Sequence, residues 1–536
     1  MTGNKRSPLA ALARLPKFVP GLLVSLVVFA WLLWVNAAGQ VFEFDPDEGN
    51  NVIKALLVRN GYHYGSEIWT DQPPLFSYLL LPFFAIFGQT MDVARGVVSG
   101  ASALLLFALY ESLRKSAGHL ASLTGVLLLL VSALYVPLSV SVMIGLPSVA
   151  FLALSMHFSI EAGSAGGRGR RVIVLAAVAG ALAGAAVGTK LFALPVVPVL
   201  GLGILVGARS SRPSEAGNDS RGTLRQRLLA ALLRGTAFSA GFVVVLLLAV
   251  APLLAAGTLS GLVDAHQVAR QQAGGTTDGL KTLIGFLSDD RALFGLAALG
   301  AALATLRGNF AAWPWLGWLV ISGLALLDHS PVWPHHRVLL TVPAAALAGH
   351  AFDLRLPERT KALLVTALRV ALPTLALAGV AAGATQPKRL EAMRSPPAWT
   401  NSKRDWEVFA VFSRYAAASK MVAAARPTYA FRSGRPVPPD LAVTSWKRFR
   451  VRLLSTKQVV DDIAANNPET VLLSHRWPGA VRAAVEKKIK KTHRRVKRWG
   501  YQSSDLWVSR DLLKKLGETA AREDDSLPRR RGDSEP

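Results

Sequence analysis

Long runs of apolar residues fill most of the first 385 positions of the chain. Four of them, residues 18–38, 93–113, 120–140 and 236–256, approach or exceed the ~20 residues that cross about 30 Å of hydrocarbon as a helix. Their glycines and alanines suit close packing between helices in lipid. The pattern predicts an α-helical polytopic membrane protein with about 11 transmembrane helices between residues 18 and 385.

One apolar segment, residues 73–88, is only 16 residues long. Counting it as a full span would reverse the sidedness of every loop that follows. We therefore predict a juxtamembrane or re-entrant helix at this position.

The pattern changes near residue 386, where short segments with helix and strand periodicity replace the long apolar runs. We expect strands at 428–431, 470–474 and 506–509, and helices at 456–465 and 478–499. These elements predict a small α/β domain over residues 386–515. The charged stretch 516–536 should be disordered, since it cannot bury enough apolar surface to fold.

Composition agrees with a membrane protein, because 51% hydrophobic residues, 18% charged residues and a mean hydropathy of +0.35 do not suit one large soluble domain. The chain has no cysteine, which excludes disulfides and cysteine-ligated metals. Its net charge is +26, and 32 of the 60 lysines and arginines follow residue 387. In a membrane-anchored chain this charge favours anionic lipid headgroups as partners over nucleic acid.

The placement of positive charge predicts the topology, because short cytoplasmic loops are rich in lysine and arginine. Residues 1–17 are then cytoplasmic, as are the basic loops at 114–115, 168–171, 209–234, 307 and 355–361. The run 18–38 is longer than a signal-peptide core, so we expect it to remain as the first span. The segments predicted to be external are 39–92, 137–147, the surroundings of Lys190, 257–290, 328–337 and the C-terminal domain.

The first external loop carries four carboxylates within six positions, at Glu43, Asp45, Asp47 and Glu48. A structural explanation is that Asp47 caps a helix over residues 48–60. Glu48 would then be stabilised by the helix dipole. In that interpretation an apolar face lies on the bilayer surface, formed by Val52, Ile53, Leu56 and Leu57.

A second explanation comes from resemblance. Asp47-Glu48-Gly49, the turn 61–65, the run 71–75 (Asp-Gln-Pro-Pro-Leu) and Ala94-Arg95 resemble motifs of the C superfamily of membrane glycosyltransferases (GT-C). The most similar group is that of the protein O-mannosyltransferases and aminoarabinose transferases, family 39-like. The resemblance covers residues 20–350 and extends to Lys190 and to 334–337 (Pro-His-His-Arg). The acidic residue common before a proline in the second external turn is missing at 143–147.

The resemblance implies transfer of a sugar from a polyprenyl phosphate to an acceptor outside the membrane. The acceptor must lose a proton, so one carboxylate can act as base. Asp47 is the candidate, and Glu48 is expected to orient the acceptor or bind a cation. Asp71 either holds the acceptor or caps the following helix.

The departing phosphate needs cations in a site of low dielectric. The candidates are Lys190, Arg95, His335 and Arg337. A lysine at the membrane boundary is costly and usually functional, although it can also snorkel to the interface. Arg95 has the alternative role of an anchor for lipid headgroups.

Some features remain open. His335 and His336 invite a metal interpretation, but adjacent histidines diverge and no third ligand has a suitable spacing. We predict no firm cofactor, with a divalent cation as a candidate. Three tryptophans at 313, 315 and 318 fit an interfacial belt or packing. The loop 257–290 is either a lid over the donor or a flexible connection.

Two other functions are alternatives to that of a transferase. A secondary transporter would favour internal repeats and charges near the bilayer midplane, whereas the acidic residues here gather in an outside loop. An inactive scaffold that binds lipid-linked sugars is the other alternative. We expect a multi-pass protein of a bacterial inner membrane, whose acceptor is an envelope glycan, lipid or protein.

The topology can be tested directly, because the chain lacks cysteine. Single cysteines at Ser66, Ser220 and Ser433 should react with an impermeant thiol reagent in intact cells only at the first and third positions. Labelling at Ser220 in intact cells would contradict the predicted topology.

Overall fold

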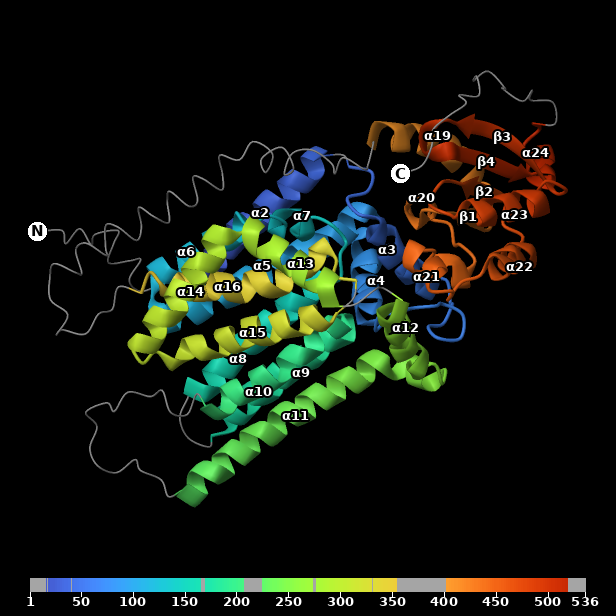
Figure 1. Ribbon diagram of the computed structural model, residues 1–536. Helices are drawn as coiled ribbons and strands as arrows, with labels where there is room; N and C mark the ends of the chain where they lie inside the picture. The colour runs from blue at the N-terminus through green and yellow to red at the C-terminus, as the bar shows by residue number, and fades with distance from the viewer. Residues whose placement is uncertain are drawn as a thin grey trace, which may run out of the picture.

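The computed structural model describes residues 16, 18–39, 41–164, 169–206, 224–272, 276–329, 331–353 and 402–518. A bundle of helices forms one body, and a small domain containing a sheet lies against one end of it (Figure 1). The predicted cytoplasmic segment 1–17, the last span near 363–384 and the tail after 518 lie almost wholly outside the described residues.

Most helices of the bundle are apolar. Within the described residues, five are long and apolar enough to span a membrane, and five shorter apolar helices lie beside them. The predicted number of spans remains a prediction. The bundle helices are α2 (Val19–Gly39), α5 (Met91–Ala117), α6 (His119–Leu130), α8 (Gly145–Ser164), α9 (Arg170–Thr189), α10 (Val197–Val206), α11 (Leu224–Ala255), α14 (Arg291–Leu306), α15 (Trp313–Asp328) and α16 (Val338–His350).

Three predictions about the bundle need correction. The expected single span 120–140 is broken into α6 and the short helix α7 (Tyr135–Ser139), because Pro137 is tolerated only in the first turn of a helix. The basic segment 224–234 is the first part of α11 rather than a loop. The segment 257–290 is largely two helices, α12 (Leu259–Gln272) and α13 (Thr276–Asp289).

Glycines set the closest packing in the bundle, between α9 and α11. A Cβ at Gly180 would overlap the backbone carbonyl of Phe238, and one at Gly241 would overlap that of Ala177. Only glycine lets the two backbones approach this far. Trp315 and Trp318 are fully buried and stack at 5.6 Å between ring centroids, so packing explains both.

The C-terminal domain has a four-stranded sheet in the order β1-β2-β4-β3. β1 (Val422–Ala424) is parallel to β2 (Thr470–Leu473), and β4 (Ser504–Ser509) is antiparallel to both β2 and β3 (His493–Trp499). The helices are α19 (Ser402–Ala416), α20 (Pro427–Arg432), α21 (Trp446–Arg450), α22 (Thr456–Asn466), α23 (Gly479–Ile489) and α24 (Arg510–Lys515).

The predictions for α22, β2 and β4 are confirmed, and two others are wrong. Residues 428–431 form α20 rather than a strand, because Pro427 starts a helix well and a short apolar run does not identify its own type. The predicted helix 478–499 ends at Ile489, and its second half is β3. Pairing with β4 there overrides the helix preference of lysine and arginine.

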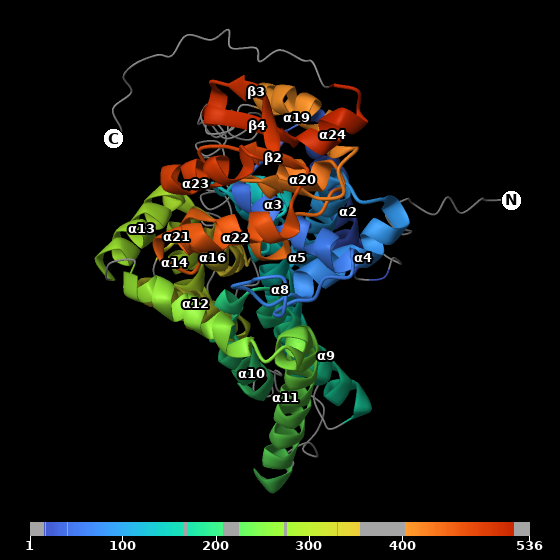
Figure 2. The same ribbon diagram turned by 90° about the vertical axis from the view of Figure 1, so that its right-hand side faces the viewer.

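Helix α3 (Pro46–Arg59) lies between the bundle and the C-terminal domain, against α4 (Leu75–Phe87) and α20 (Figure 2). The prediction that its apolar face lies on the bilayer is wrong. Val52, Ile53, Leu56 and Leu57 are at most 1% exposed and belong to the protein core. An amphipathic helix beside a membrane has the same sequence pattern whether lipid or protein covers it.

We predict that Gly180→Ala destabilises the protein by roughly 1 to 3 kcal/mol, since the added methyl group meets backbone and the two helices must separate. Gly285→Ala in α13 is the control, because its Cβ has nothing within 4 Å and alanine favours a helix. Thermal unfolding in one detergent measures both. Equal stability of Gly180→Ala and the wild type would refute the packing argument.

Candidate active site

The first turn of α3 organises the acidic loop. Asp45 is the N-cap, and its Oδ1 accepts the backbone N–H of Asp47 at 2.9 Å. Pro46 occupies the first helical position, where its missing N–H costs nothing. The prediction that Asp47 caps the helix is therefore wrong, and its carboxylate is left for other contacts.

Glu48 is fully buried and its carboxylate is saturated with donors. The Arg95 guanidinium donates to both of its oxygens, at 3.0 and 2.8 Å. The backbone N–H groups of Phe44 and Val142 donate to it at 2.6 and 2.8 Å. Arg95 also donates to the carbonyl of Val41 at 3.0 Å. The predicted catalytic Glu48 and the predicted phosphate-binding Arg95 thus bind each other, and neither side chain is directed to a ligand by these contacts.

Asp47 has a different environment on the same helix. It is partly buried, and its Oδ1 accepts a hydrogen bond from the Asn50 side chain at 3.2 Å. Burial raises the pKa of Asp47, while the charge of Lys190 opposes the rise and that of Asp71 adds to it. A carboxylate with a raised pKa and a cation nearby is suited to accept a proton.

Lys190 follows the last residue of α9 in an extended conformation and precedes the 3₁₀ helix η1 (Leu191–Val196). Its side chain is 8% exposed, and its ammonium lies 4.7 Å from the centre of the Phe192 ring. The ammonium also lies 3.7 Å from the Cβ position of Gly145, beside the segment whose Val142 N–H binds Glu48 of the acidic loop.

Asp71 belongs to the same group of charges. Its Oδ2 lies 3.2 Å from the Lys447 ammonium of the C-terminal domain. Burial alone would raise the pKa of Asp71, but Lys447 and Lys54 outweigh that effect and hold it below its ordinary value. The adjacent Gln72 amide lies 3.2 Å from the ring of His266 on α12.

The three basic residues at 335–337, of which His335 and Arg337 are the predicted site residues, divide into two kinds. His335 and His336 have pKa values well below the ordinary range because they are buried and Lys190 adds positive charge, so both are neutral near pH 7. Neutral imidazoles offer hydrogen bonds rather than charge. Arg337 is paired with Asp289 at 2.5 Å and with Asp290 at 3.6 Å.

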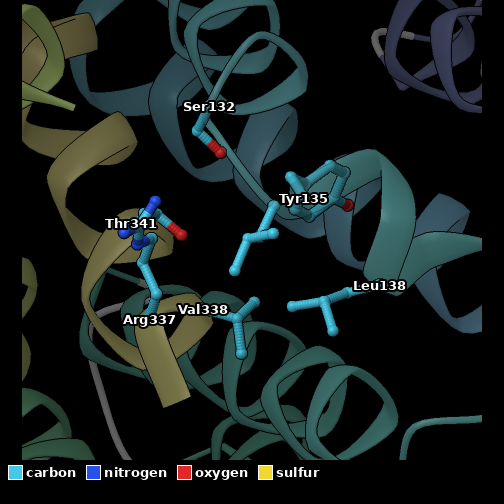
Figure 3. A pocket seen from close by; sticks show the side chains of 7 residues that line it. Ser132, Tyr135, Leu138, Arg337, Val338 and Thr341 are labelled. Carbon is cyan, nitrogen blue, oxygen red and sulfur yellow. The ribbon is translucent and has the colours of Figure 1, made fainter. Parts of the chain in front are cut away.

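Arg337 also lines a narrow hollow with residues of the α6–α7 connection, of α7 and of α16 (Figure 3). Arg337 and Thr341 lie on one side of it, and Tyr135 and Leu138 on the other. The hollow leaves no room for a water molecule. The hollow is therefore a packing gap beside the Arg337 side chain and not a substrate pocket.

Five segments that precede the C-terminal domain were predicted to lie outside the membrane, and they meet at one end of the bundle. Glu48 binds the backbone of Val142, Asp47 interacts with Lys190, and Gln72 contacts His266. The ring of His336 lies 6.0 Å from that of Phe192. Segments separated by up to some 300 positions in the sequence thus form a single polar site.

Sequence reasoning missed Lys54 and Lys447. Lys54 sits on the polar side of an amphipathic helix, where a lysine has no distinctive signal, yet it is 6% exposed and interacts with Asp47 and Asp71. Lys447 is one of many basic residues in the tail. Among the described residues, no group of three or more His, Asp or Glu side chains is arranged to hold a metal.

Comparison with known proteins identifies the fold. Residues 71–214 match the family model of dolichyl-phosphate-mannose-protein mannosyltransferases. The ArnT structure from Cupriavidus metallidurans bound to undecaprenyl phosphate superposes with a TM-score of 0.60 at 15% identity, covering 92% of this chain and 98% of that one. The chain has an ArnT-like GT-C fold. The fold expected from the sequence motifs is confirmed, and the family-model match over residues 71–214 agrees with the resemblance.

A second solved structure with this fold is the archaeal oligosaccharyltransferase AglB from Archaeoglobus fulgidus, in complex with an inhibitory peptide and a dolichol-phosphate. It has a TM-score of 0.53 at 12% identity and covers 92% of this chain and 74% of that one. A search of curated protein sequences gives no match. The fold and the apolar helices together indicate a multi-pass membrane protein.

The pairing of Glu48 and Arg95 predicts a loss of stability when it is broken. Glu48→Gln leaves a buried guanidinium without its counter-charge and should destabilise the protein by about 3 kcal/mol in thermal unfolding. Glu67→Gln, at an exposed position of the same loop, should have little effect. A Glu48→Gln protein as stable as the wild type would refute this prediction.

The raised pKa of Asp47 predicts a pH dependence. If Asp47 is the base, kcat/KM falls as the pH drops through that pKa, which lies above the value of about 4 for an ordinary aspartate. Lys54→Met removes a positive charge that interacts with Asp47 and favours its ionised form. The acidic side of the pH profile of kcat/KM should then move to higher pH, whereas exposed Asp92→Asn should leave it in place. An acidic side that Lys54→Met does not move would count against Asp47 as the titrating base.

Proposed function

We propose that this protein is a membrane glycosyltransferase that moves a sugar from a polyprenyl-phosphate donor to an acceptor hydroxyl or amine. The observation that carries the proposal is that residues 142–145 join the first turn of α3 to Lys190: the neighbour of Asp47, Glu48, accepts the backbone N–H of Val142 at 2.8 Å, and the Lys190 ammonium lies 3.7 Å from the Cβ position of Gly145. A carboxylate with a raised pKa and a buried ammonium share one polar site, which supplies a base for the acceptor and a cation for the phosphate.

In the proposed reaction Asp47 accepts the proton of the acceptor while the acceptor oxygen or nitrogen forms a bond to the anomeric carbon. The bond from that carbon to the phosphate oxygen breaks, and its electron pair leaves with the polyprenyl phosphate. A phosphate leaving group needs no proton from the protein, so a single carboxylate is sufficient.

The leaving phosphate gains negative charge as the bond breaks, and Lys190 stabilises that charge in a site shielded from water. His335 supplies a hydrogen bond, and Asp71 holds the acceptor. Glu48 and Arg95 fix the loop that presents Asp47. Arg337, bound to Asp289 and Asp290, fixes the segment that carries His335.

The comparisons support the choice of donor. ArnT was solved with undecaprenyl phosphate and AglB with a dolichol-phosphate, and both share the fold of this chain. By analogy the donor here is a lipid-linked sugar, and the acceptor is an envelope glycan, lipid or protein. The proposed setting is a bacterial inner membrane with the C-terminal domain outside.

Purified protein in nanodiscs tests the proposal. Asp47→Asn should abolish turnover of a lipid-linked sugar while retaining its binding. Lys190→Ala should weaken binding of undecaprenyl phosphate about 10- to 150-fold, the value of one charge-assisted contact. Lys281→Ala on an exposed part of α13 is the matched control.

Two results would overturn the proposal. One is equal binding of undecaprenyl phosphate by the wild type and Lys190→Ala. The other is sugar-dependent ion flux in liposomes without turnover of any lipid-linked donor, which would favour a transporter.

A further inference from the structure

We infer that Lys447 of the C-terminal domain is a second phosphate-binding residue of this site, so that the active site is shared between the bundle and that domain. The inference rests on the proposed function and extends it to a residue 376 positions from Asp71 in the sequence. Three features of the structure and the charge of the donor support it.

The position of Lys447 is fixed by its neighbours. Ser445 caps α21, and its Oγ accepts the backbone N–H of Arg448 at 3.3 Å. The Arg448 guanidinium lies 4.3 Å from the centre of the Trp69 ring and donates to Asp440 Oδ1 at 2.7 Å. Arg448 thus holds α21 against the loop that contains Asp71.

Because Arg448 provides this anchor, Lys447 is not required to dock the helix. Arg448 is 2% exposed, whereas Lys447 is 26% exposed and its carboxylate partner Asp71 is 23% exposed. A buried arginine beside a half-buried lysine on one short helix indicates that the first is structural and the second is accessible to a ligand.

Lys447 lies beside the proposed phosphate site. Its ammonium is 3.2 Å from Asp71 Oδ2, and the run 71–75 packs against the end of α9, where the Cβ position of Gly188 lies 3.5 Å from the Leu75 side chain. Lys190 follows two residues after Gly188, so Lys447 and Lys190 approach this site from different domains. Lysine is a point charge on a flexible stem, so its ammonium can move from Asp71 to an incoming anion.

The chemistry of the donor requires a second cation. A sugar linked through a phosphodiester carries one negative charge, and the polyprenyl phosphate that leaves is a monoester with about 1.5 to 2 negative charges near pH 7. Lys190 can neutralise the single negative charge of the donor phosphodiester. Lys447 neutralises the additional negative charge that develops on the leaving phosphate. When the Lys447 ammonium moves away from Asp71, the Asp71 carboxylate becomes free to hold the acceptor.

Binding of undecaprenyl phosphate to the full chain in nanodiscs tests the inference, with undecaprenol as the uncharged reference. Lys447→Met should weaken phosphate binding about tenfold or more, and Lys447→Arg should retain most of it. Lys457→Met is the control, because Lys457 is 86% exposed in the same domain and pairs only locally with Asp461.

The Asp71→Asn variant distinguishes two roles of Lys447: binding the phosphate, or tethering the C-terminal domain through its ion pair with Asp71. It frees the Lys447 ammonium, so phosphate binding should stay the same or become tighter. If Lys447 only tethers the domain through Asp71, then Asp71→Asn and Lys447→Met should weaken binding equally, and that result would overturn the inference.

Two other outcomes are also decisive. Undiminished binding by Lys447→Met, with the wild type binding undecaprenyl phosphate better than undecaprenol, overturns the inference but leaves the proposed function intact. A wild type that binds both lipids equally overturns the proposed function and this inference together.

Discussion

A buried arginine between two carboxylates holds the two parts of this molecule together. Arg426 of the C-terminal domain donates to Glu43 of the first loop at 2.6 Å and to Asp405 of α19 at 2.6 Å, and all three side chains are at most 3% exposed. Burying such charges is costly unless each has its partner, so the loop and the domain must meet in one arrangement. Thr428 adds a hydrogen bond to Glu43, and Arg432 binds the carbonyl of Phe42 at 2.7 Å. The position of α3, and with it Asp47, depends on this contact.

Two acidic residues next to each other on α3 have different environments, which is the reason for the different roles proposed for them. Glu48 points into the protein, where a guanidinium and two backbone N–H groups satisfy its charge. Asp47 points to the polar site, where it has one side-chain hydrogen bond and burial raises its pKa. A carboxylate whose charge is fully satisfied is a poor base, whereas one that is incompletely satisfied has a reason to take a proton. The proposed division between a positioning residue and a base therefore follows from a turn of about 100° along one helix.

Local sequence signals were sufficient for part of this description. The acidic residues before an amphipathic stretch indicated a helix over residues 48–60, close to the observed α3, and strand periodicity indicated β2 and β4. Family resemblance, rather than spacing, pointed to Asp47 and Lys190. Contacts between distant residues could not be predicted in this way, because a single sequence does not show that Glu48 pairs with Arg95 or Asp71 with Lys447. The same limit explains the error over Val52 and Leu56, whose apolar pattern is compatible with burial by lipid or by another domain.

The contact of Gly49 with Thr428 has a consequence for the order in which the protein is made. Gly49 lies so close to Thr428 that a Cβ at this position would approach the backbone nitrogen of Thr428 to 2.6 Å. The surface of α3 is thus completed by a segment that the ribosome adds almost 380 residues later. Chains fold from the N-terminus during synthesis, so the acidic loop must wait, uncovered, until the C-terminal domain emerges. A nascent or truncated chain without that domain consequently lacks the contacts that hold α3 and Asp47 of the proposed site in place.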